Sequence, residues 1–140
     1  MTSEFGIAVH ALTFLNHKQA TVSSEQLAHN ICTHPARVRK VMAKLKKHGL
    51  VETREGAEGG YLFTRDPAGV TLRQVGDAVA VQFVGTAWRS GDADMDCLVA
   101  SGMADIMDGI YSELDGLCRE RLASYTIADI DRRIFGPGTA

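Results

Sequence analysis

Apolar residues recur at helical spacing along most of the chain, and short polar or glycine-rich stretches separate these runs. The first run extends from Ser3 to about His17 and predicts a largely buried helix with Ser3 as its N-cap. A shorter run opens with Ser23-Ser24-Glu25-Gln26, which resembles a capping box. We therefore expect a second helix that ends near Cys32.

A basic and amphipathic stretch follows, from Thr33 to Val51. At about 100° per residue, a helix here carries apolar side chains on one arc and basic side chains on another. The apolar set is Val38, Val41, Met42 and Leu45, and the basic set is Arg37, Lys40, Lys44 and Lys47. Thr33 is the expected cap, with Pro35 in the first turn. Two helices separated by so short a turn predict a helix-turn-helix.

A β-hairpin is predicted directly after the basic helix. Gly49 is expected at the C′ position of that helix. Two short strands, at 50–53 and 61–64, then flank a glycine-rich tip at 54–60. A helix-turn-helix followed by such a hairpin is a winged helix. Thr71 is expected to cap one more helix, over residues 72–81.

The second half of the chain is dominated by one long helical pattern, at 97–123. Its apolar residues alternate between spacings of four and three, as in a coiled-coil seam. The seam, which we take as the dimer interface, is Met103, Met107, Ile110, Leu114 and Leu117. A small domain cannot cover so much apolar surface, so we expect a second copy to pair with it. A short final helix is expected over 127–134.

Length and composition agree with a compact, folded chain. With 140 residues, of which 45% are hydrophobic, the sequence can form one or two small domains with a core. The predicted fold class is mainly α with a small β-hairpin wing. It comprises a winged helix-turn-helix DNA-binding domain at 1–82, a hinge at 83–96 and a helical dimerisation region at 97–140.

Charge is unevenly distributed, although the formal net charge is only −2. Residues 34–54 hold seven basic residues and one acid, whereas the chain from Asp92 onward holds ten acids and four arginines. Such segregation indicates a nucleic-acid-facing half and a half with another task. We expect the basic helix to lie in the major groove of DNA. There Arg can read guanine with two donors, and Lys mostly meets phosphates as a point charge.

The candidate DNA-binding residues come from the basic helix, the wing and the helix caps. Each group also has a purely structural explanation. The basic helix residues would form a solvated face, the wing glycines would serve turn geometry, and the cap residues would only cap their helices. Glycines let backbone N–H groups approach phosphates, and caps can also donate to phosphate. The residues are Arg37, Lys40, Lys44 and Lys47 in the helix, Arg54, Gly59 and Gly60 in the wing, and Ser24 and Thr33 at the caps. Arg39 and Lys46 point elsewhere and are expected to be flank contacts or plain surface.

Three cysteines at wide spacing, Cys32, Cys97 and Cys118, form no disulfide framework and are expected to be reduced thiols. Cys97, near the start of the long helix, is either a redox-sensing thiol or a small packed residue, and the sequence leaves both open. Cys32 and Cys118 are expected in the core. His29, Cys32 and His34 straddle the turn between two helices, so no metal site is predicted there.

Several other classes of function find no support in the sequence. The first twenty residues lack the basic start and apolar run of a signal peptide, and no stretch approaches the roughly 20 apolar residues that span a bilayer. We therefore expect a cytoplasmic protein without membrane contact. No nucleophile–base pair, P-loop or Rossmann fingerprint is visible, so we expect no enzyme. Phe83 and Trp88 either line a small effector pocket or, as we prefer, pack the hinge.

The wing and the segment after it resemble those of a known bacterial family. The wing carries Gly59-Gly60-Tyr61, and Thr71-Leu72 opens the next helix four residues after Pro67. These motifs are similar to those of the Rrf2 family of transcription regulators, over about residues 1–80 and in outline along the long helix. The resemblance implies a dimer that binds imperfect palindromes through the helix-turn-helix and the wing, usually as a repressor.

Two features depart from that family. Its recognition helix usually carries an aromatic residue near its start, where this chain has Arg37 and Val38, so no target sequence is implied. Its iron–sulfur members carry three clustered cysteines before or at the start of the long helix, where this chain has only Cys97. We therefore predict no cofactor, and in particular no iron–sulfur cluster.

The leading interpretation is a dimeric, sequence-specific DNA-binding transcriptional regulator. It would bind a palindromic operator in double-stranded DNA as a repressor and respond to redox change or to a small effector. The alternative is a protein-interaction module of the same fold whose DNA binding is controlled by a partner protein. Weak operator binding by the chain alone would favour that alternative.

Overall fold

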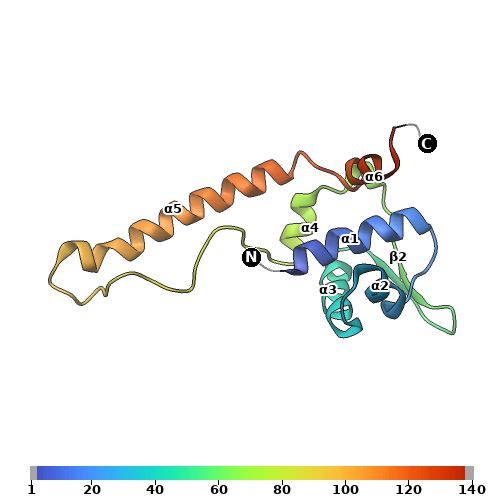
Figure 1. Ribbon diagram of the computed structural model, residues 1–140, viewed down its shortest axis with the longest axis horizontal. Coiled ribbons are helices and arrows are strands. Elements are labelled where there is room, and N and C mark those ends of the chain that lie inside the picture. The colour runs from blue at the N-terminus through green and yellow to red at the C-terminus, as the bar shows by residue number, and fades with distance from the viewer. Residues whose placement is uncertain (1–2, 138–140) are drawn as a thin grey trace.

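The N-terminal helix α1, Ser3–Lys18, is the element on which the body of the protein is packed. The computed structural model describes residues 3–137; residues 1–2 and 138–140, the outer ends of the first and last predicted regions, lie outside it. Helix α1 contacts α2, α3, α4 and α6, and Figure 1 shows it running through the middle of the body. Its buried face includes Ala8, Leu12 and Leu15, as the spacing predicts.

The predicted helix-turn-helix is present, with its caps shifted by one residue. Helix α2, Ser24–Ile31, is capped by Ser23, whose hydroxyl accepts from the Gln26 N–H in a capping box. Helix α3, Pro35–Lys47, follows His34, whose side chain makes no capping hydrogen bond. The expectation that Thr33 caps α3 is therefore wrong. The Thr33 N–H instead donates to the Ala28 carbonyl at 3.0 Å, so Thr33 closes the end of α2.

The predicted wing is also present, although its strands are short. Strand β1, Glu52–Arg54, pairs antiparallel with β2, Gly60–Leu62, with Thr53 opposite Tyr61. Tyr61 makes two backbone hydrogen bonds to Val22, at 2.9 and 3.0 Å, so the segment before α2 extends the sheet. Gly49, at φ +72°, lies at the end of α3, and the Leu50 N–H donates to the Leu45 carbonyl at 2.9 Å. That closure places Gly49 at C′, as predicted.

Helix α4, Leu72–Ala78, follows a single 3-10 turn, Pro67–Gly69, and Thr71 caps it as expected. The helix ends three residues earlier than predicted. Ala80 takes a left-handed conformation, at φ +53°, and the Val81 N–H closes onto the Gly76 carbonyl at 3.0 Å. Val81 is nevertheless fully buried, so its apolar character reflects the core rather than a longer helix.

Residues 83–97 run outward from the body, and the long helix α5, Leu98–Leu122, lies alongside them, so that together they project as an arm (Figure 1). Helix α6, Ile127–Phe135, then returns to the body. The Ile127 N–H donates to the Val70 carbonyl at 3.0 Å, and the Leu72 N–H donates to the Tyr125 carbonyl at 2.8 Å. These bonds fasten the chain after the arm to the start of α4.

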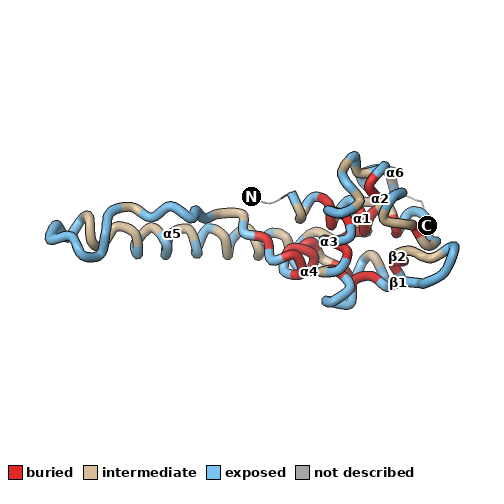
Figure 2. The backbone as a smooth tube through the Cα atoms, turned by 90° about the horizontal axis from the view of Figure 1, so that it is seen from below, coloured by how far each residue is buried: buried red, intermediate tan, exposed pale blue. Residues whose placement is uncertain are grey.

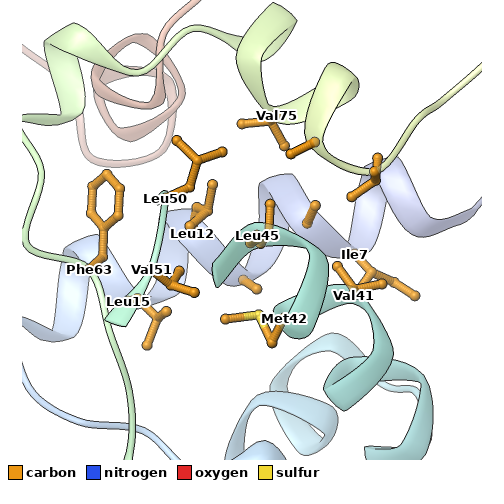
Figure 3. Packing of buried hydrophobic residues seen from close by; sticks show 14 of the residues in the cluster. Ile7, Leu12, Leu15, Val41, Met42, Leu45, Leu50, Val51, Phe63 and Val75 are labelled. Atoms are coloured by element: carbon orange, nitrogen blue, oxygen red, sulfur yellow. The ribbon is translucent and has the colours of Figure 1, made fainter. Parts of the chain in front are cut away.

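The hydrophobic core lies entirely in the body. Phe63 and residues of α1, α3 and α4 fill it, among them Leu12, Met42 and Val75, and Figure 3 shows the side chains in contact. By contrast, α5 contains no buried residue, and Figure 2 shows the arm only half-buried or exposed. Two cysteine predictions are corrected accordingly, because Cys32 is exposed and Cys118 is half-buried. No described helix has both the length and the apolarity needed to cross a membrane.

Candidate nucleic-acid interface

Helix α3 presents a cationic surface because its apolar side chains are fully used by the core. Val38, Val41, Met42 and Leu45 are at most 1% exposed. The residues opposite them are exposed or half-buried, and no acid occurs in the helix. The basic residues divide into two flanks and an outer edge, and each flank faces a different neighbouring element.

One flank of α3 faces the start of α1. Lys44 donates to both carboxylate oxygens of Glu4, at 3.0 and 3.1 Å, and its side chain is only 35% exposed. The Lys40 ammonium lies 3.9 Å from the same carboxylate but is 71% exposed. Arg37 donates to the hydroxyl of Ser3. Of the predicted groove contacts, Arg37 and Lys44 are therefore engaged with α1 in the free protein.

The opposite flank faces α2 and the wing. Arg39 donates to the Ser24 hydroxyl at 3.3 Å and lies 3.7 Å from the Glu25 carboxylate. Lys46 donates to the hydroxyl of Thr53, in β1, at 2.9 Å. The seven-residue spacing of Arg39 and Lys46 places them on one face of the helix. The sequence already contains this signal, although the face was expected to make only flank contacts or none.

Lys47 lies at the exposed outer edge of α3. Within residues 3–137 it makes neither an ion pair nor a hydrogen bond to another side chain. Lys40, on the same outer surface, keeps most of its charge toward solvent. These two ammonium groups are the predicted contacts that the structure leaves available to phosphates.

A shallow polar hollow of about 310 Å³ separates the start of α2 from the wing. Its lining includes Ser24 from α2 and three predicted wing residues, Arg54, Gly59 and Gly60. The hollow lies at the N-terminal end of α2, which favours an anion, whereas the Glu25 carboxylate in its lining opposes one. The structure thus brings the predicted wing residues together with Ser24 beside Arg39, although Ser24 is the first residue of α2 rather than its cap.

Tyr61, at the edge of that hollow, illustrates the local electrostatics. Partial burial raises the pKa of its hydroxyl, while the positive charge of Arg39 acts in the opposite direction. The phenol therefore stays neutral and can donate a hydrogen bond. Thr33, by contrast, lies at the turn and belongs to the closure of α2, away from this hollow.

The glycines of the wing have a clear structural reason. A β-carbon on Gly59 would lie 2.4 Å from the Arg54 carbonyl oxygen, and one on Gly60 would lie 2.5 Å from the Val22 carbonyl oxygen. Both distances are too short for any side chain. The turn therefore requires Gly59, and the close approach of the Val22 backbone requires Gly60, whatever further contact the two glycines make with DNA.

The arm holds the remaining candidate residues. Cys97 is the exposed N-cap residue of α5, and the N–H groups of Ala100 and Val99 lower the pKa of its thiol. Met103 and Met107 are half-buried, whereas Ile110, Leu114 and Leu117 are 43–54% exposed. Phe83 packs edge-on against Phe5, with ring centroids 5.2 Å apart. Trp88 is 74% exposed, so the expectation that it packs the hinge is wrong, and the gap of about 30 Å³ beside it is too small for an effector.

The model of the Rrf2 family, described as iron-dependent transcriptional regulators, matches residues 1–133. The donors present do not fit an iron site within one chain. Cys32 ends α2, Cys97 starts α5, and Cys118 lies about six turns further along that helix. Among residues 3–137, no three His, Cys, Asp or Glu side chains are placed to hold a metal. The absence of a cofactor in the assembled protein stays a prediction.

Comparison with individual proteins agrees with the family match. Two Bacillus subtilis proteins classed as HTH-type transcriptional regulators are similar to the chain: YwnA and YwgB. YwnA is 27% identical over 96% of this chain and 99% of its own length. YwgB is 30% identical over 77% of this chain and 74% of its own length. The crystal structure of a Lactobacillus plantarum protein has the same fold, with a TM-score of 0.86 at 24% identity over 99% of this chain and 94% of that one. The chain is therefore a DNA-binding transcriptional regulator of the Rrf2 family rather than an enzyme.

Proposed function

We propose that the protein is a homodimer that binds a palindromic operator and represses transcription. The observation that carries the proposal is the unpartnered apolar face of α5. Val99 is 66% exposed, Ile106 is 59% exposed and Leu117 is 54% exposed, all on the same face of the arm. Leaving such a row in water forfeits about 25 cal/mol per Å² of apolar surface. A second copy of the arm would bury it.

A row of glycines borders that apolar face. Gly102, Gly109 and Gly116 recur every seven residues, so they lie on one side of the helix. A β-carbon at any of the three would meet no atom of this chain within 4 Å. The side chain–free edge would allow a partner helix to approach closely, because interaxial distance depends on side-chain size at the contact.

Pairing of the arms would give the two recognition helices a fixed separation. In helix-turn-helix dimers that separation is about 34 Å, one turn of DNA, so that both helices enter successive major grooves. The wing hollow and the outer edge of α3 would then lie against the phosphates of each half-site. Bound near a promoter, such a dimer blocks access to the DNA, which is the basis for proposing repression.

Replacing Ile110 by Lys tests the dimer directly. The buried charge would oppose pairing, so sedimentation equilibrium should report half the mass of the wild type. Ser112→Lys, on the opposite and exposed side of α5, is the matched control and should stay dimeric. A wild-type protein that sediments as a monomer, or an Ile110→Lys variant that stays dimeric, would contradict the proposal.

Selection of sites from a random duplex library tests the operator. The expected outcome is an inverted repeat whose half-sites lie about 10 base pairs apart, centre to centre. The Ile110→Lys variant should lose the paired sites and retain weak binding to single half-sites. Repression is then tested by placing the selected site in a promoter and measuring transcription with and without the protein.

We further propose that Cys97 is a redox trigger. A peroxide would oxidise the thiol to a sulfenic acid, with one oxygen transferred to sulfur and the other leaving as water. The lowered pKa and the exposure of Cys97 favour this chemistry. Peroxide should release DNA from the wild type and leave DNA bound by Cys97→Ser.

The alternative function, control by a partner protein, has one observation in its favour. The outer end of the arm exposes Met95 (51%) and Leu98 (85%), and Trp88 (74%) is exposed beside the middle of α5. Aromatic and aliphatic side chains of this kind are typical anchors of protein interfaces. Tight operator binding by the purified chain alone would argue for the homodimeric repressor and against this alternative.

A further inference from the structure

A hollow of about 600 Å³ lies between α1 and α6, and we call it the α1–α6 hollow. It lies apart from the hinge, where an effector pocket is the less favoured of the two interpretations of the sequence. Its walls are mostly apolar, with Phe5, Val9 and Phe14 on α1 and Ile130 and Ile134 on α6. Pockets of 300–1,000 Å³ with apolar walls and a few converging polar groups are typical small-molecule sites.

The polar groups of the hollow gather along one side of α1. His10 and Asn30 form a hydrogen bond of 2.7 Å in which the ring Nε2–H donates to the amide Oδ1. That bond leaves the NH₂ group of Asn30 as a donor. His17 stacks on Phe135, with ring centroids 4.4 Å apart and planes 15° apart, so an imidazole and a benzene ring form a flat wall.

The charge of the lining restricts the ligand. No Asp or Glu lines the hollow, whereas two histidines and one amide do. Histidine and an Asn NH₂ group can donate to an anionic oxygen, and the absence of a carboxylate removes repulsion. The hollow is therefore complementary to a molecule with a flat or branched apolar body and a carboxylate at one end.

We infer that the α1–α6 hollow binds small aromatic carboxylic acids, with the carboxylate at His17 and the apolar body between α1 and α6. The site does not depend on the proposed DNA function. Its regulatory use does rest on that function, through two connections. Helix α1 holds the recognition helix through Glu4 and Lys44, and α6 is continuous with the arm through residues 123–126. A ligand that wedges between α1 and α6 would bias both.

Gly6 gives a clean way to block the hollow. It lines the hollow, and a β-carbon there would meet no atom within 4 Å. Gly6→Met should therefore fill the space without disturbing the core, and it removes a helix-weakening glycine. Gly69→Met, at an exposed turn outside the hollow with its nearest atom 4.0 Å away, is the matched control.

The test is isothermal titration of the full chain with 1-naphthaleneacetate and with its neutral amide, in the absence of DNA. The acid should bind once per chain, and the amide should bind about tenfold more weakly because it lacks the charge-assisted hydrogen bonds. Gly6→Met should abolish binding, and Gly69→Met should leave it unchanged. His17→Phe keeps the stack on Phe135, so it should weaken binding of the acid and leave binding of the amide unchanged.

Three binding results would overturn the inference. They are no binding of the acid at millimolar concentration, equal binding of acid and amide, and unaltered binding by Gly6→Met. A change in sedimenting mass of Gly6→Met would also overturn it, because it would show that a second copy of the chain covers the hollow. If the acid binds as expected but the chain binds no DNA, the proposed function fails and the site stands.

Discussion

The Lys44 ammonium lies 3.0 Å from one carboxylate oxygen of Glu4 and 3.1 Å from the other, so a cation of the recognition helix is neutralised from within the protein. Both side chains are partly buried, with 35% and 21% of their surface exposed. The lysines of the predicted DNA-binding arc therefore differ in how much charge they can offer to DNA. Lys47 and Lys40 face solvent, while Lys44 holds α3 against α1.

This inequality predicts different salt dependences for two otherwise similar substitutions. Lys47→Ala should reduce the slope of log K against log salt by about 1, because one phosphate contact is lost. Lys44→Ala should change the slope little and instead lower the free energy of unfolding by about 1 kcal/mol at most, as expected for a partly exposed ion pair. Fluorescence anisotropy with a random-sequence duplex, over a range of salt concentrations, measures the slope. Equal slopes for both variants would contradict the assignment.

The course of the chain could be predicted from sequence because its signals are local. Periodicity placed the long helix at 97–123, and α5 spans Leu98–Leu122. Gly49 predicted the end of α3 because a left-handed residue is needed there. The prediction that Thr33 caps α3 failed because the Thr33 N–H closes the end of α2. Its acceptor is the Ala28 carbonyl, five residues earlier, so the residues around Thr33 alone do not reveal the bond.

Contacts between distant residues could not be predicted in this way. Glu4 and Lys44 are forty residues apart, and nothing in the sequence around either residue specifies the pair. Likewise, the α1–α6 hollow joins the two ends of the chain, so neither helical pattern alone indicates a site. Arg39 and Lys46 show the intermediate case, since their shared face is predictable but its neighbours, Ser24 and Thr53, are not.

The wing should depend on the absence of a side chain at Gly60. A β-carbon there would lie 2.5 Å from the oxygen and 2.7 Å from the carbon of the Val22 carbonyl. Gly60→Ala should therefore force β2 away from Val22 and cost about 1–3 kcal/mol, as overpacking usually does. Thermal unfolding measures the loss, and hydrogen exchange at the Val22 and Tyr61 amides locates it. Gly69→Ala, in open space, should have no such effect.

Asp115 fastens the hinge to the arm and should make this junction sensitive to acid. Its carboxylate accepts from the Phe83 and Val84 N–H groups, at 2.7 and 3.0 Å, and from Arg119 at 3.2 Å. The Val84 N–H is the main cause of its lowered pKa, and the Phe83 N–H and Arg119 add to it. Because the folded pKa lies below the unfolded value of about 3.9, the stabilisation is complete above that pH and is lost as pH falls through the folded pKa.

Asp115→Asn should therefore be less stable than the wild type at neutral pH, and the difference should shrink below about pH 4. Urea unfolding at a series of pH values measures it. Glu113→Gln removes a charge from an exposed position of the same helix and serves as the control. If both variants showed the same pH dependence, the contribution of Asp115 would be one of general charge rather than of its three hydrogen-bond donors.

Cys97 should be the most reactive thiol of the folded protein. It is exposed at the start of α5, where the N–H groups of Ala100 and Val99 favour the thiolate and lower the pKa, although the thiol closes no capping hydrogen bond. Because alkylation follows the thiolate fraction, limited iodoacetamide at neutral pH should modify Cys97 before Cys32 and Cys118. Peptide mass spectrometry gives the order of modification.

The same experiment in guanidinium chloride distinguishes the effect of the folded helix on Cys97 reactivity from the effect of the neighbouring residues in the sequence. Unfolding removes the oriented N–H groups of α5 but keeps Asp94 and Asp96 next to Cys97, and these carboxylates disfavour a thiolate. The preference for Cys97 should therefore disappear or reverse in denaturant. If Cys97 kept its lead in the unfolded chain, its reactivity would not come from the start of α5, and a change in arm structure could not tune it.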